Sequence, residues 1–423
     1  MNFAKLQKLS YSILVYYFCI LFFIMKIGIL RETKVPLDSR VALTPKQCAE
    51  LVKKHPKISI VVQSSTSRCF SDDEYVQVGI DIVNDINDCD ILLGVKEVNL
   101  DSLISHKTYF YFSHTIKKQP YNRSLLKKMI DLRIKMVDYE VLKNLDGSRI
   151  LGFGRYAGIV GAYNAFLTYG LKTGLYNLKP AFKCQDRYEM EKELNKIILK
   201  NERIVVTGKG RVGRGILEFL SNYGLKQVSV NDFLNLKYNE PVFVHLDTLD
   251  YNERNDGVKS DLIHFYKYPK LYKSTFMNYA KKSDIFIAGH FYGFGSPFLL
   301  TKDDIKSQDF NFKVIADISC DIDGPIASTI RSSTIQNPIY GYDVIQQKEV
   351  NFMNDSALAV MAVSNLPCEL PKDASKDFGD SLLDNVIPHL INDQENVVLN
   401  ATICEEGDLT PNFEYLRDYI NKN

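Results

Sequence analysis

Short apolar runs alternate with stretches of helical character from residue 26 onward. Ile27–Leu30 and Ile58–Gln63 have strand length, and Thr44-Pro45 between them is typical of a helix cap followed by a first-turn proline. Further strands are predicted at Ile91–Val95, Tyr109–Phe112, Lys135–Val137, Arg203–Thr207, Val228–Asn231, Ile285–Ala288 and Val314–Ile318. Buried strands that alternate with helices are typical of parallel sheets covered on both faces. The pattern therefore predicts an α/β fold of doubly wound, Rossmann-like sheets.

The length of the chain divides this pattern into two domains, because 423 residues exceed one typical core. Tyr156 to about Leu178 is apolar and rich in small residues, which predicts a buried helix that joins the domains. Residues 179–202 are charged and predict an exposed helix, and a polar helical segment follows Pro371. We expect a substrate-binding catalytic domain (26–153 with 372–423), a nucleotide-binding Rossmann domain (154–371), and an active-site cleft between them.

An apolar segment precedes this pattern. Tyr11–Met25 is almost wholly apolar, is too short to cross a bilayer, and matches the length of a signal-peptide core. Phe22–Met25 offers no small residue for a cleavage site, and Met25 begins a segment typical of a cytosolic enzyme. Two interpretations stay open for residues 1–24: an extension from an upstream start codon, or an anchor or uncleaved signal.

The charge and cysteine content of the chain exclude several classes of function. The 52 basic residues nearly cancel the 51 acidic ones, so no basic stripe for nucleic acid is expected. The eight cysteines include no Cys-x-x-Cys pair, which argues against a zinc site or a disulfide framework and for a reducing compartment. We therefore expect a cytoplasmic protein that acts on a small molecule, with no metal and no membrane attachment. The oligomeric state stays open.

A glycine-rich loop follows the predicted strand Arg203–Thr207. Gly208, Gly210 and Gly213 have the spacing of a dinucleotide fingerprint, and a helical segment comes next. The first glycine allows the tight turn, the second lets the backbone approach a pyrophosphate, and the third allows close packing of helix and strand. The loop predicts a bound dinucleotide. A Rossmann-like domain without nucleotide is the alternative.

The identity of the dinucleotide depends on nearby charges. Asp232 ends the next predicted strand, 24 positions after Gly208, where a carboxylate would bind a ribose 2′-hydroxyl. This favours NAD. Lys209, Arg211 and Arg214 keep NADP as an alternative, because a cation can accept a 2′-phosphate.

Two other predicted strands each end in a proton-transfer residue. Lys96 follows Ile91–Val95 and His114 follows Tyr109–Phe112. Each is more often a solvated or structural residue, but burial at a strand end would depress the pKa of both toward neutrality. Arg31 should lie at the same sheet edge and suits a carboxylate. Together they predict an oxidoreductase acting on an amine or imine, with an acid/base pair beside a nicotinamide.

Several motifs resemble a known family. Gly28–Lys34 and Asp38–Pro45 are similar to the start of the alanine dehydrogenase, transhydrogenase and saccharopine dehydrogenase superfamily. Narrower motifs resemble lysine-forming saccharopine dehydrogenases, and equally the lysine–2-oxoglutarate reductase half of a bifunctional enzyme of lysine metabolism. These motifs are Gly94–Glu97, Phe112–Gln119, Gly152–Gly158, Ala316–Asp321 and Asn365–Pro371. The resemblance spans residues 26 to 390.

The resemblance implies an NAD-dependent oxidoreductase of the CH–NH group that cleaves saccharopine to lysine and 2-oxoglutarate, or runs in reverse. Lys96 would be the general base and His114 the general acid. Substrate would be bound by Arg31, Gln119, Arg149, Phe153, Ser319, Cys320 and Asp321. The cofactor would be bound by Gly208, Gly210, Arg211, Val212, Gly213, Asp232, Gly289, Ile318, Val363, Ser364, Asn365 and Leu366.

The chain departs from the family pattern at three positions. Ser364 stands where the family usually has aspartate, Ser148 where yeast-type enzymes have a second arginine, and Ala288 where asparagine is usual. Two other functions therefore stay open. One is an alanine dehydrogenase-like enzyme, although Thr115–Gln119 differs from the apolar segment of those enzymes. The other is a non-catalytic nucleotide-binding protein.

Overall fold

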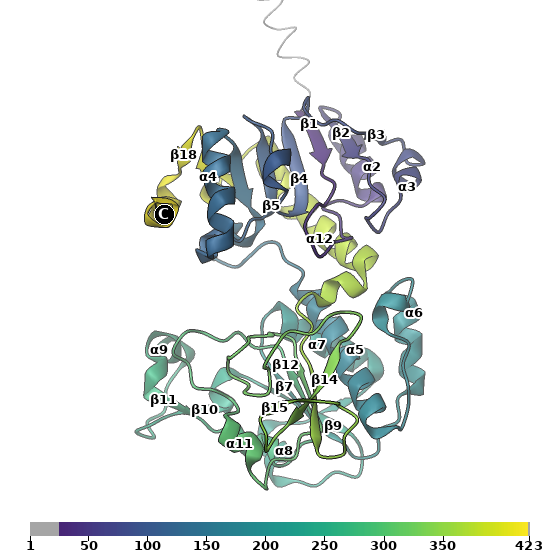
Figure 1. Ribbon diagram of the computed structural model, residues 1–423, viewed down its shortest axis with the longest axis vertical. Coiled ribbons are helices and arrows are strands. Elements are labelled where there is room, and N and C mark those ends of the chain that lie inside the picture. The colour runs from purple at the N-terminus through teal and green to yellow at the C-terminus, as the bar shows by residue number, and fades with distance from the viewer. Residues whose placement is uncertain (1–24, 422–423) are drawn as a thin grey trace, which may run out of the picture. The chain divides into compact units, whose positions relative to one another are not determined.

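The computed structural model describes residues 25–421, which form two compact units (Figure 1). Unit 1 comprises the described residues up to Gly152 and those from Ala374 onward, and unit 2 comprises Phe153–Asp373. The sequence prediction places these boundaries one or two residues away. The predicted extension, residues 1–24, lies outside the described residues. Within residues 25–421, no helix has both the length and the apolar character that crossing a membrane requires.

Unit 1 contains one eight-stranded sheet. Its spatial order is β18 (Asp408–Leu409), β17 (Thr402–Glu405), β6 (Lys135–Asp138), β5 (Thr108–Phe112), β4 (Ile91–Lys96), β1 (Met25–Ile29), β2 (Ile58–Gln63) and β3 (Asp81–Val83). The run from β6 to β3 is parallel, and Figure 1 shows β5, β4, β1 and β2 side by side. β17 and β18 are antiparallel and come from the end of the chain.

Seven helices accompany this sheet among the described residues, and the first two, at Pro45 and Asp72, begin at side-chain caps. They are α2 (Pro45–Lys54), α3 (Asp72–Val76), α4 (Arg123–Asp131), α12 (Pro371–Asn385, whose first three residues belong to unit 2), α13 (Ile387–Ile391), α14 (Val397–Ala401) and α15 (Arg417–Asn421). The Thr44 side chain and Gln47 form a capping box at α2. Gln47 Nε2 also donates to Asp380 Oδ1 of α12 at 2.7 Å, so the late helix packs against the early one.

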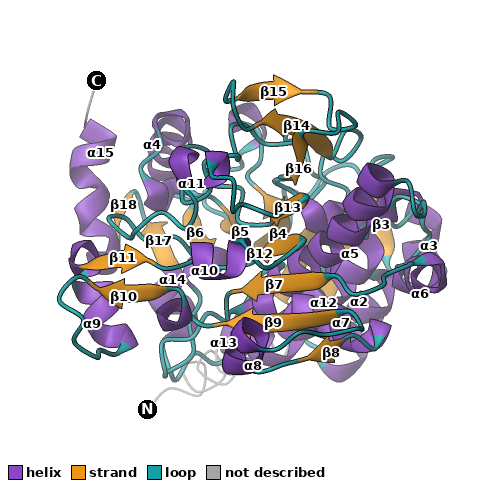
Figure 2. Ribbon diagram, turned by 90° about the horizontal axis from the view of Figure 1, so that it is seen from below, coloured by secondary structure: helices purple, strands orange, loops and turns teal. Residues whose placement is uncertain are grey.

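Unit 2 contains a second eight-stranded sheet. Its order is β15 (Lys348–Val350), β14 (Ile339–Asp343), β16 (Ala357–Met361), β13 (Val314–Asp317), β12 (Ile285–Ala288), β7 (Arg203–Thr207), β9 (Val242–Leu246) and β8 (Lys226–Gln227). The strands from β16 to β8 are parallel, and Figure 2 shows β12, β7, β9 and β8 in that order. β10 (Asn252–Arg254) and β11 (Tyr272–Ser274) form a separate hairpin.

A buried helix organises unit 2. The helices are α5 (Gly154–Thr173), α6 (Arg187–Lys192), α7 (Arg211–Tyr223), α8 (Val230–Asn235), α9 (Leu262–Lys267), α10 (Met277–Ala280) and α11 (Lys302–Lys306). α5 is buried over most of its length, as its apolar sequence predicts. It crosses α7 closely, because a Cβ on Gly158 would lie 2.1 Å from the Val212 carbonyl oxygen and one on Gly215 would lie 2.1 Å from the Arg155 carbonyl oxygen.

Two predicted elements differ in the structure. The strand predicted at Val228–Asn231 is wrong, because Ser229 caps a helix there: its hydroxyl accepts from Asp232 N at 3.1 Å and α8 follows. On the side of β7 away from β12, the neighbouring strand is β9, which the sequence prediction missed. The long exposed helix predicted over 179–202 is also wrong, since only the six residues of α6 and two 3₁₀ turns form, Ala181–Lys183 and Glu193–Lys196.

Candidate active site

The glycine loop of unit 2 has the geometry that dinucleotide binding requires. Gly208 adopts φ +95°, and a Cβ there would lie 2.2 Å from the Gly289 carbonyl oxygen. A Cβ on Gly213 would lie 1.8 Å from the Gly208 carbonyl oxygen, so α7 packs tightly against the loop. A Cβ on Gly210, by contrast, would meet no protein atom within 4 Å, so the backbone at this position is open to a ligand. α7 begins directly after this loop, and helix N-termini bind phosphates through the backbone N–H groups of their first turn. The loop therefore fits a dinucleotide.

The other predicted cofactor residues gather at the same sheet edge. Arg211 and Val212 begin α7, Gly289 follows β12, Ile318 follows β13, and Val363, Ser364, Asn365 and Leu366 follow β16. Since these strands are parallel, their carboxyl ends share one edge, where doubly wound sheets bind ligands. Gly289 N donates to Thr207 O at 3.1 Å and Ile318 N to Ala288 O at 3.0 Å, which ties these ends together.

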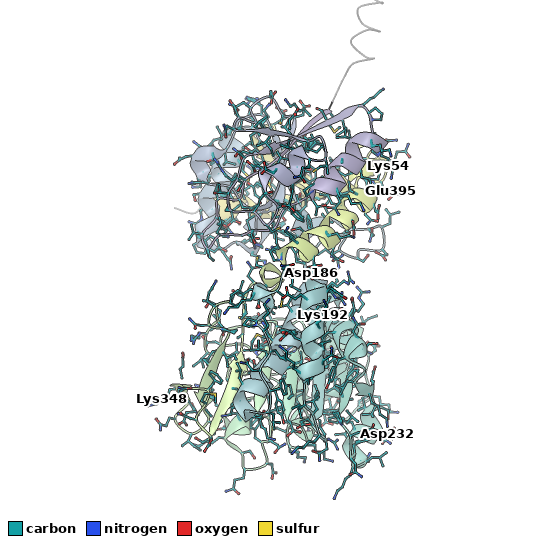
Figure 3. All side chains as sticks on the ribbon, turned by 90° about the vertical axis from the view of Figure 1, so that its right-hand side faces the viewer. Lys54, Asp186, Lys192, Asp232, Lys348 and Glu395 are labelled. Carbon is teal, nitrogen blue, oxygen red and sulfur yellow. The ribbon has the colours of Figure 1, made fainter. Side chains whose placement is uncertain are left out.

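Asp232 does not lie where the sequence analysis expects it. It belongs to the first turn of α8 and follows the edge strand β8, which β9 separates from β7. Figure 3 shows its side chain at the periphery of unit 2. The premise for a ribose contact, a carboxylate at the end of the strand beside β7, is therefore not met by Asp232.

Asp247 meets that premise instead. It follows β9 directly, and its carboxylate lies 2.9 Å from Lys209 Nζ of the glycine loop. Burial alone would raise the pKa of Asp247, but the hydrogen bond from Lys209 lowers it below its ordinary value. His245 of β9 is partly buried, and its Nε2 lies 2.8 Å from the Gly208 carbonyl oxygen. Sequence reasoning missed both residues because it placed the neighbouring strand too early.

In unit 1, a β-bulge places Lys96. Leu93 pairs with Phe110 but Lys96 pairs with Phe112, so β4 carries one extra residue before the lysine. The buried Glu32 carboxylate holds this bulge by accepting from Val95 N at 2.6 Å and Lys96 N at 2.9 Å. Burial raises the pKa of Glu32 to about 8.

The environment of Lys96 disfavours its charged form. Burial lowers the pKa of Lys96 below its ordinary value, and the positive charge of Arg40 adds to this effect. Arg40 is itself buried and binds Asp38 through Nε and Nη2. A lysine that loses its proton more easily than usual can serve as a base.

His114 lies at the end of the neighbouring strand, two residues after the partner of Lys96. Its backbone is left-handed, with φ +56°, and its ring stacks on Phe112 with centroids 6.3 Å apart. The backbone next to His114 is fixed by a hydrogen bond, because Ser113 N donates to the buried Asp138 carboxylate at 3.1 Å. Burial raises the pKa of Asp138. A non-glycine residue fixed in this region is often found at functional sites.

Glu140 connects His114 to two cations. Its Oε2 lies 3.3 Å from His114 Nδ1, and its Oε1 lies 3.4 Å from Lys117 Nζ and 3.2 Å from Arg149 Nη2. Burial alone would raise the pKa of Glu140, but the His114 hydrogen bond and the charges of Lys117 and Arg149 lower it to about 2. Sequence reasoning missed Glu140, although an acidic residue just after the strand beside the histidine is a usable signal.

Replacing Glu140 by glutamine is expected to destabilise unit 1 in a pH-dependent way. The lowered pKa means that ionised Glu140 stabilises the fold above the ordinary carboxyl value of 4.5 and that this contribution is lost as pH falls toward about 2. At neutral pH the loss should be roughly 1–3 kcal/mol, reduced from the full linkage value because Lys117 and Arg149 are half exposed. Urea unfolding at pH 7, 4 and 2.5 measures it. Glu395→Gln, at an exposed carboxylate of the same unit (Figure 3), is the matched control and should change little. A deficit independent of pH would contradict the assignment.

The remaining predicted substrate residues of unit 1 lie at separate places. Arg31 is exposed and lines a cavity of about 340 Å³ with Gln63 and Asn84, while its Nη1 donates to Ser64 O at 3.3 Å. Arg149 lies at the Glu140 cluster instead. Gln119 is exposed, and its carbonyl accepts from Tyr419 Oη at 2.5 Å. Arg31 and Arg149 are therefore associated with different strand ends, β1 and β6.

The predicted substrate residues of unit 2 surround a buried carboxylate. Asp317 Oδ1 accepts from Ser319 Oγ at 2.6 Å and from Cys320 N at 3.1 Å. Burial and the charge of Asp317 raise the pKa of Cys320 to about 12 and also raise that of Asp321. Cys320 therefore carries a thiol rather than a thiolate. Phe153, at the start of α5, is the first residue of unit 2.

Residues 28–160 match the family model described as alanine dehydrogenase/PNT, N-terminal domain. The family resemblance predicted from the motifs is confirmed, as is the α/β class of Rossmann-like sheets. An L-alanine dehydrogenase structure superposes with a TM-score of 0.65 over 94% of this chain and 100% of that one, at 16% identity.

Curated relatives extend beyond the alanine dehydrogenase/PNT domain. The mitochondrial alpha-aminoadipic semialdehyde synthase of Mus musculus is 29% identical over 440 residues, which covers 92% of this chain and 47% of that protein. The chain thus spans about half the length of this relative. The NAD⁺-dependent, L-lysine-forming saccharopine dehydrogenase of Candida glabrata is 26% identical, over 83% of this chain and 88% of that one. That of Emericella nidulans is 24% identical, over 88% and 93%.

Proposed function

We propose that this chain is an NAD-dependent, L-lysine-forming saccharopine dehydrogenase, or runs the same reaction in reverse. The observation that carries the proposal is the pair Lys96 and His114. Lys96 ends β4 and His114 follows β5, the parallel strand paired with it, and the pKa of Lys96 is lowered. The similarity to saccharopine dehydrogenases over most of their length supports the substrate class. Oxidation of a secondary amine needs such a pair of proton carriers.

The nucleotide would be held by the glycine loop. Gly208 to Gly213 and the N-terminus of α7 would bind the pyrophosphate, and Asp247 would accept from a ribose hydroxyl in the place first assigned to Asp232. A free ribose hydroxyl beside a carboxylate favours NAD over NADP. The bound nicotinamide supplies the hydride acceptor.

The proton steps are assigned to unit 1. Neutral Lys96 would accept the proton of the secondary amine as the substrate Cα loses its hydride, which leaves an imine. His114, held by Glu140, would move a proton from the attacking water and then to the departing amine, so that the carbinolamine collapses to lysine and 2-oxoglutarate. Arg31 and Arg149, at different strand ends, would bind separate carboxylates of an elongated substrate.

Steady-state assays test the proposal directly. Purified protein with saccharopine and NAD should produce NADH, and lysine with 2-oxoglutarate should consume it. An alanine dehydrogenase-like activity would instead require pyruvate and ammonia. Absence of turnover in both directions, with NADH and with NADPH, would remove the proposal.

Gly210→Ala is expected to weaken nucleotide binding without harming the fold. The new methyl group meets no protein atom within 4 Å, so the melting temperature should stay the same. It would occupy the space through which the backbone approaches a pyrophosphate, and NADH affinity should fall roughly tenfold or more. NADH fluorescence titration measures this, and binding of nicotinamide mononucleotide, which lacks the pyrophosphate, is the control. Unchanged NADH affinity would place the pyrophosphate elsewhere.

A further inference from the structure

An exposed aromatic loop follows β12 in unit 2. Between His290 and Leu299, the side chains of Phe291, Phe294 and Phe298 are 86%, 97% and 43% exposed. Each phenylalanine left in water forgoes roughly 1.5–3 kcal/mol of burial. Neighbouring aromatic groups exposed to this degree usually mark a surface that is covered when the protein functions.

The loop is held in a defined conformation. Ser296 N donates to Gly293 O at 3.0 Å and Tyr292 Oη donates to Ser296 O at 3.1 Å, which closes a turn around Phe294. Gly295 adopts φ +83° and packs against Lys270, where a Cβ would lie 3.6 Å from Cε. The base of the loop is therefore fixed while Phe294 projects from it.

The base of the loop contacts the end of β7, the strand that precedes the glycine loop. His290 Nδ1 lies 2.8 Å from Thr207 Oγ1, and the Gly289 carbonyl closes on Gly208. Burial and the negative charge of Asp321, which follows β13, raise the pKa of Tyr292 in this loop. The base of the loop thus lies at the carboxyl edge of the sheet, beside the glycine loop.

We propose that residues 291–298 cover the nicotinamide end of a dinucleotide bound to unit 2, with Phe291 and Phe294 packing over the ligand. This inference rests on the proposed function, since it requires a bound dinucleotide. Packing on the ligand would remove the apolar side chains from water and exclude water from the hydride-transfer step. The nicotinamide ring and its amide offer a flat surface of the kind aromatic side chains contact.

Tryptophan substitution tests the location, because the chain has no tryptophan. Phe294→Trp introduces a single reporter, and Tyr188→Trp introduces one on α6, where the native side chain is 68% exposed. Saturating NAD⁺ should reduce acrylamide quenching of the first reporter roughly threefold and leave the second unchanged. Equal quenching with and without NAD⁺ at position 294 would overturn the inference, provided the variant binds NAD⁺ by calorimetry.

A second experiment separates the two ends of the ligand. The double variant Phe291→Ser, Phe294→Ser should bind NADH roughly tenfold more weakly while binding ADP-ribose, which lacks nicotinamide, as well as wild type. Tyr266→Ser, at an exposed aromatic of α9, is the matched control. Equal loss for both ligands, or no loss, would overturn the inference.

Three further outcomes are decisive. If wild type binds ADP-ribose but oxidises no amino acid, the proposed function fails while the loop inference is still judged by the tryptophan reporter. If wild type binds no dinucleotide, both fail. If the double variant instead changes the sedimentation coefficient of the protein, the loop is an interface between copies and the inference is overturned.

Discussion

Replacing Lys96 by methionine is expected to lower kcat for saccharopine oxidation roughly 10²–10⁴-fold while leaving NADH affinity unchanged, as removal of a general base does. The loss should fall on turnover because Lys96 belongs to unit 1, whereas the glycine loop belongs to unit 2. Lys96→Arg keeps the positive charge but cannot give up its proton at working pH, so it should be equally inactive. Steady-state kinetics and NADH titration measure both properties.

The pH profile adds a second test for Lys96. Since only neutral lysine accepts a proton, oxidation should rise with pH through the pKa of Lys96, which lies below the ordinary 10.5. Lys53→Met, the same change at an exposed position of α2, is the matched control and should behave as wild type. Activity retained in Lys96→Arg would show that Lys96 supplies charge rather than a base.

Gly158→Ala is expected to destabilise unit 2 strongly. The added Cβ would lie 2.1 Å from the Val212 carbonyl oxygen and 2.8 Å from Ile216 N, both backbone atoms of α7. Because no side chain can rotate away, α5 and α7 must separate, at a cost of roughly 3 kcal/mol or more. The melting temperature should fall roughly 6–12 °C.

Gly210→Ala provides the matched control for this measurement. It adds the same methyl group in the same unit but meets no atom within 4 Å. Differential scanning calorimetry should therefore separate the two variants clearly. Equal melting temperatures would mean that α5 and α7 can shift apart at little cost, and the tight crossing would not be a source of stability.

The sequence predicted the elements whose local signals agree with their tertiary environment. β2 and β12 have the predicted bounds, and α2 begins at the predicted Thr44 cap, because an apolar run or a capping residue there decides the structure alone. The strand predicted at 228–231 failed because Ser229 supplies a cap in a β-branched segment. The same residues can form a strand or a capped helix, and the choice depends on which strand pairs with β7 on the side away from β12.

The residues of the candidate site that come directly at the ends of apolar strands could be predicted from the sequence. Lys96 and His114 could be placed on one sheet edge from the apolar runs before them. Glu140 could not be assigned its role, since its link to Lys117 and Arg149 depends on how β6 and the following loop return to the histidine. Asp247 was hidden for the same reason, because its importance depends on β9 being the neighbour of β7.

Unit 1 is built from two segments of the chain that flank unit 2, and this order affects how the protein folds during synthesis. Its sheet is completed by β17 and β18, which lie after all of unit 2 in the chain. On the ribosome, unit 2 is therefore the first to have all of its strands, while β6 waits with an unpaired edge. A truncated chain that ends near residue 373 should aggregate through that edge, whereas the excised segment 153–373 has every strand of its own sheet.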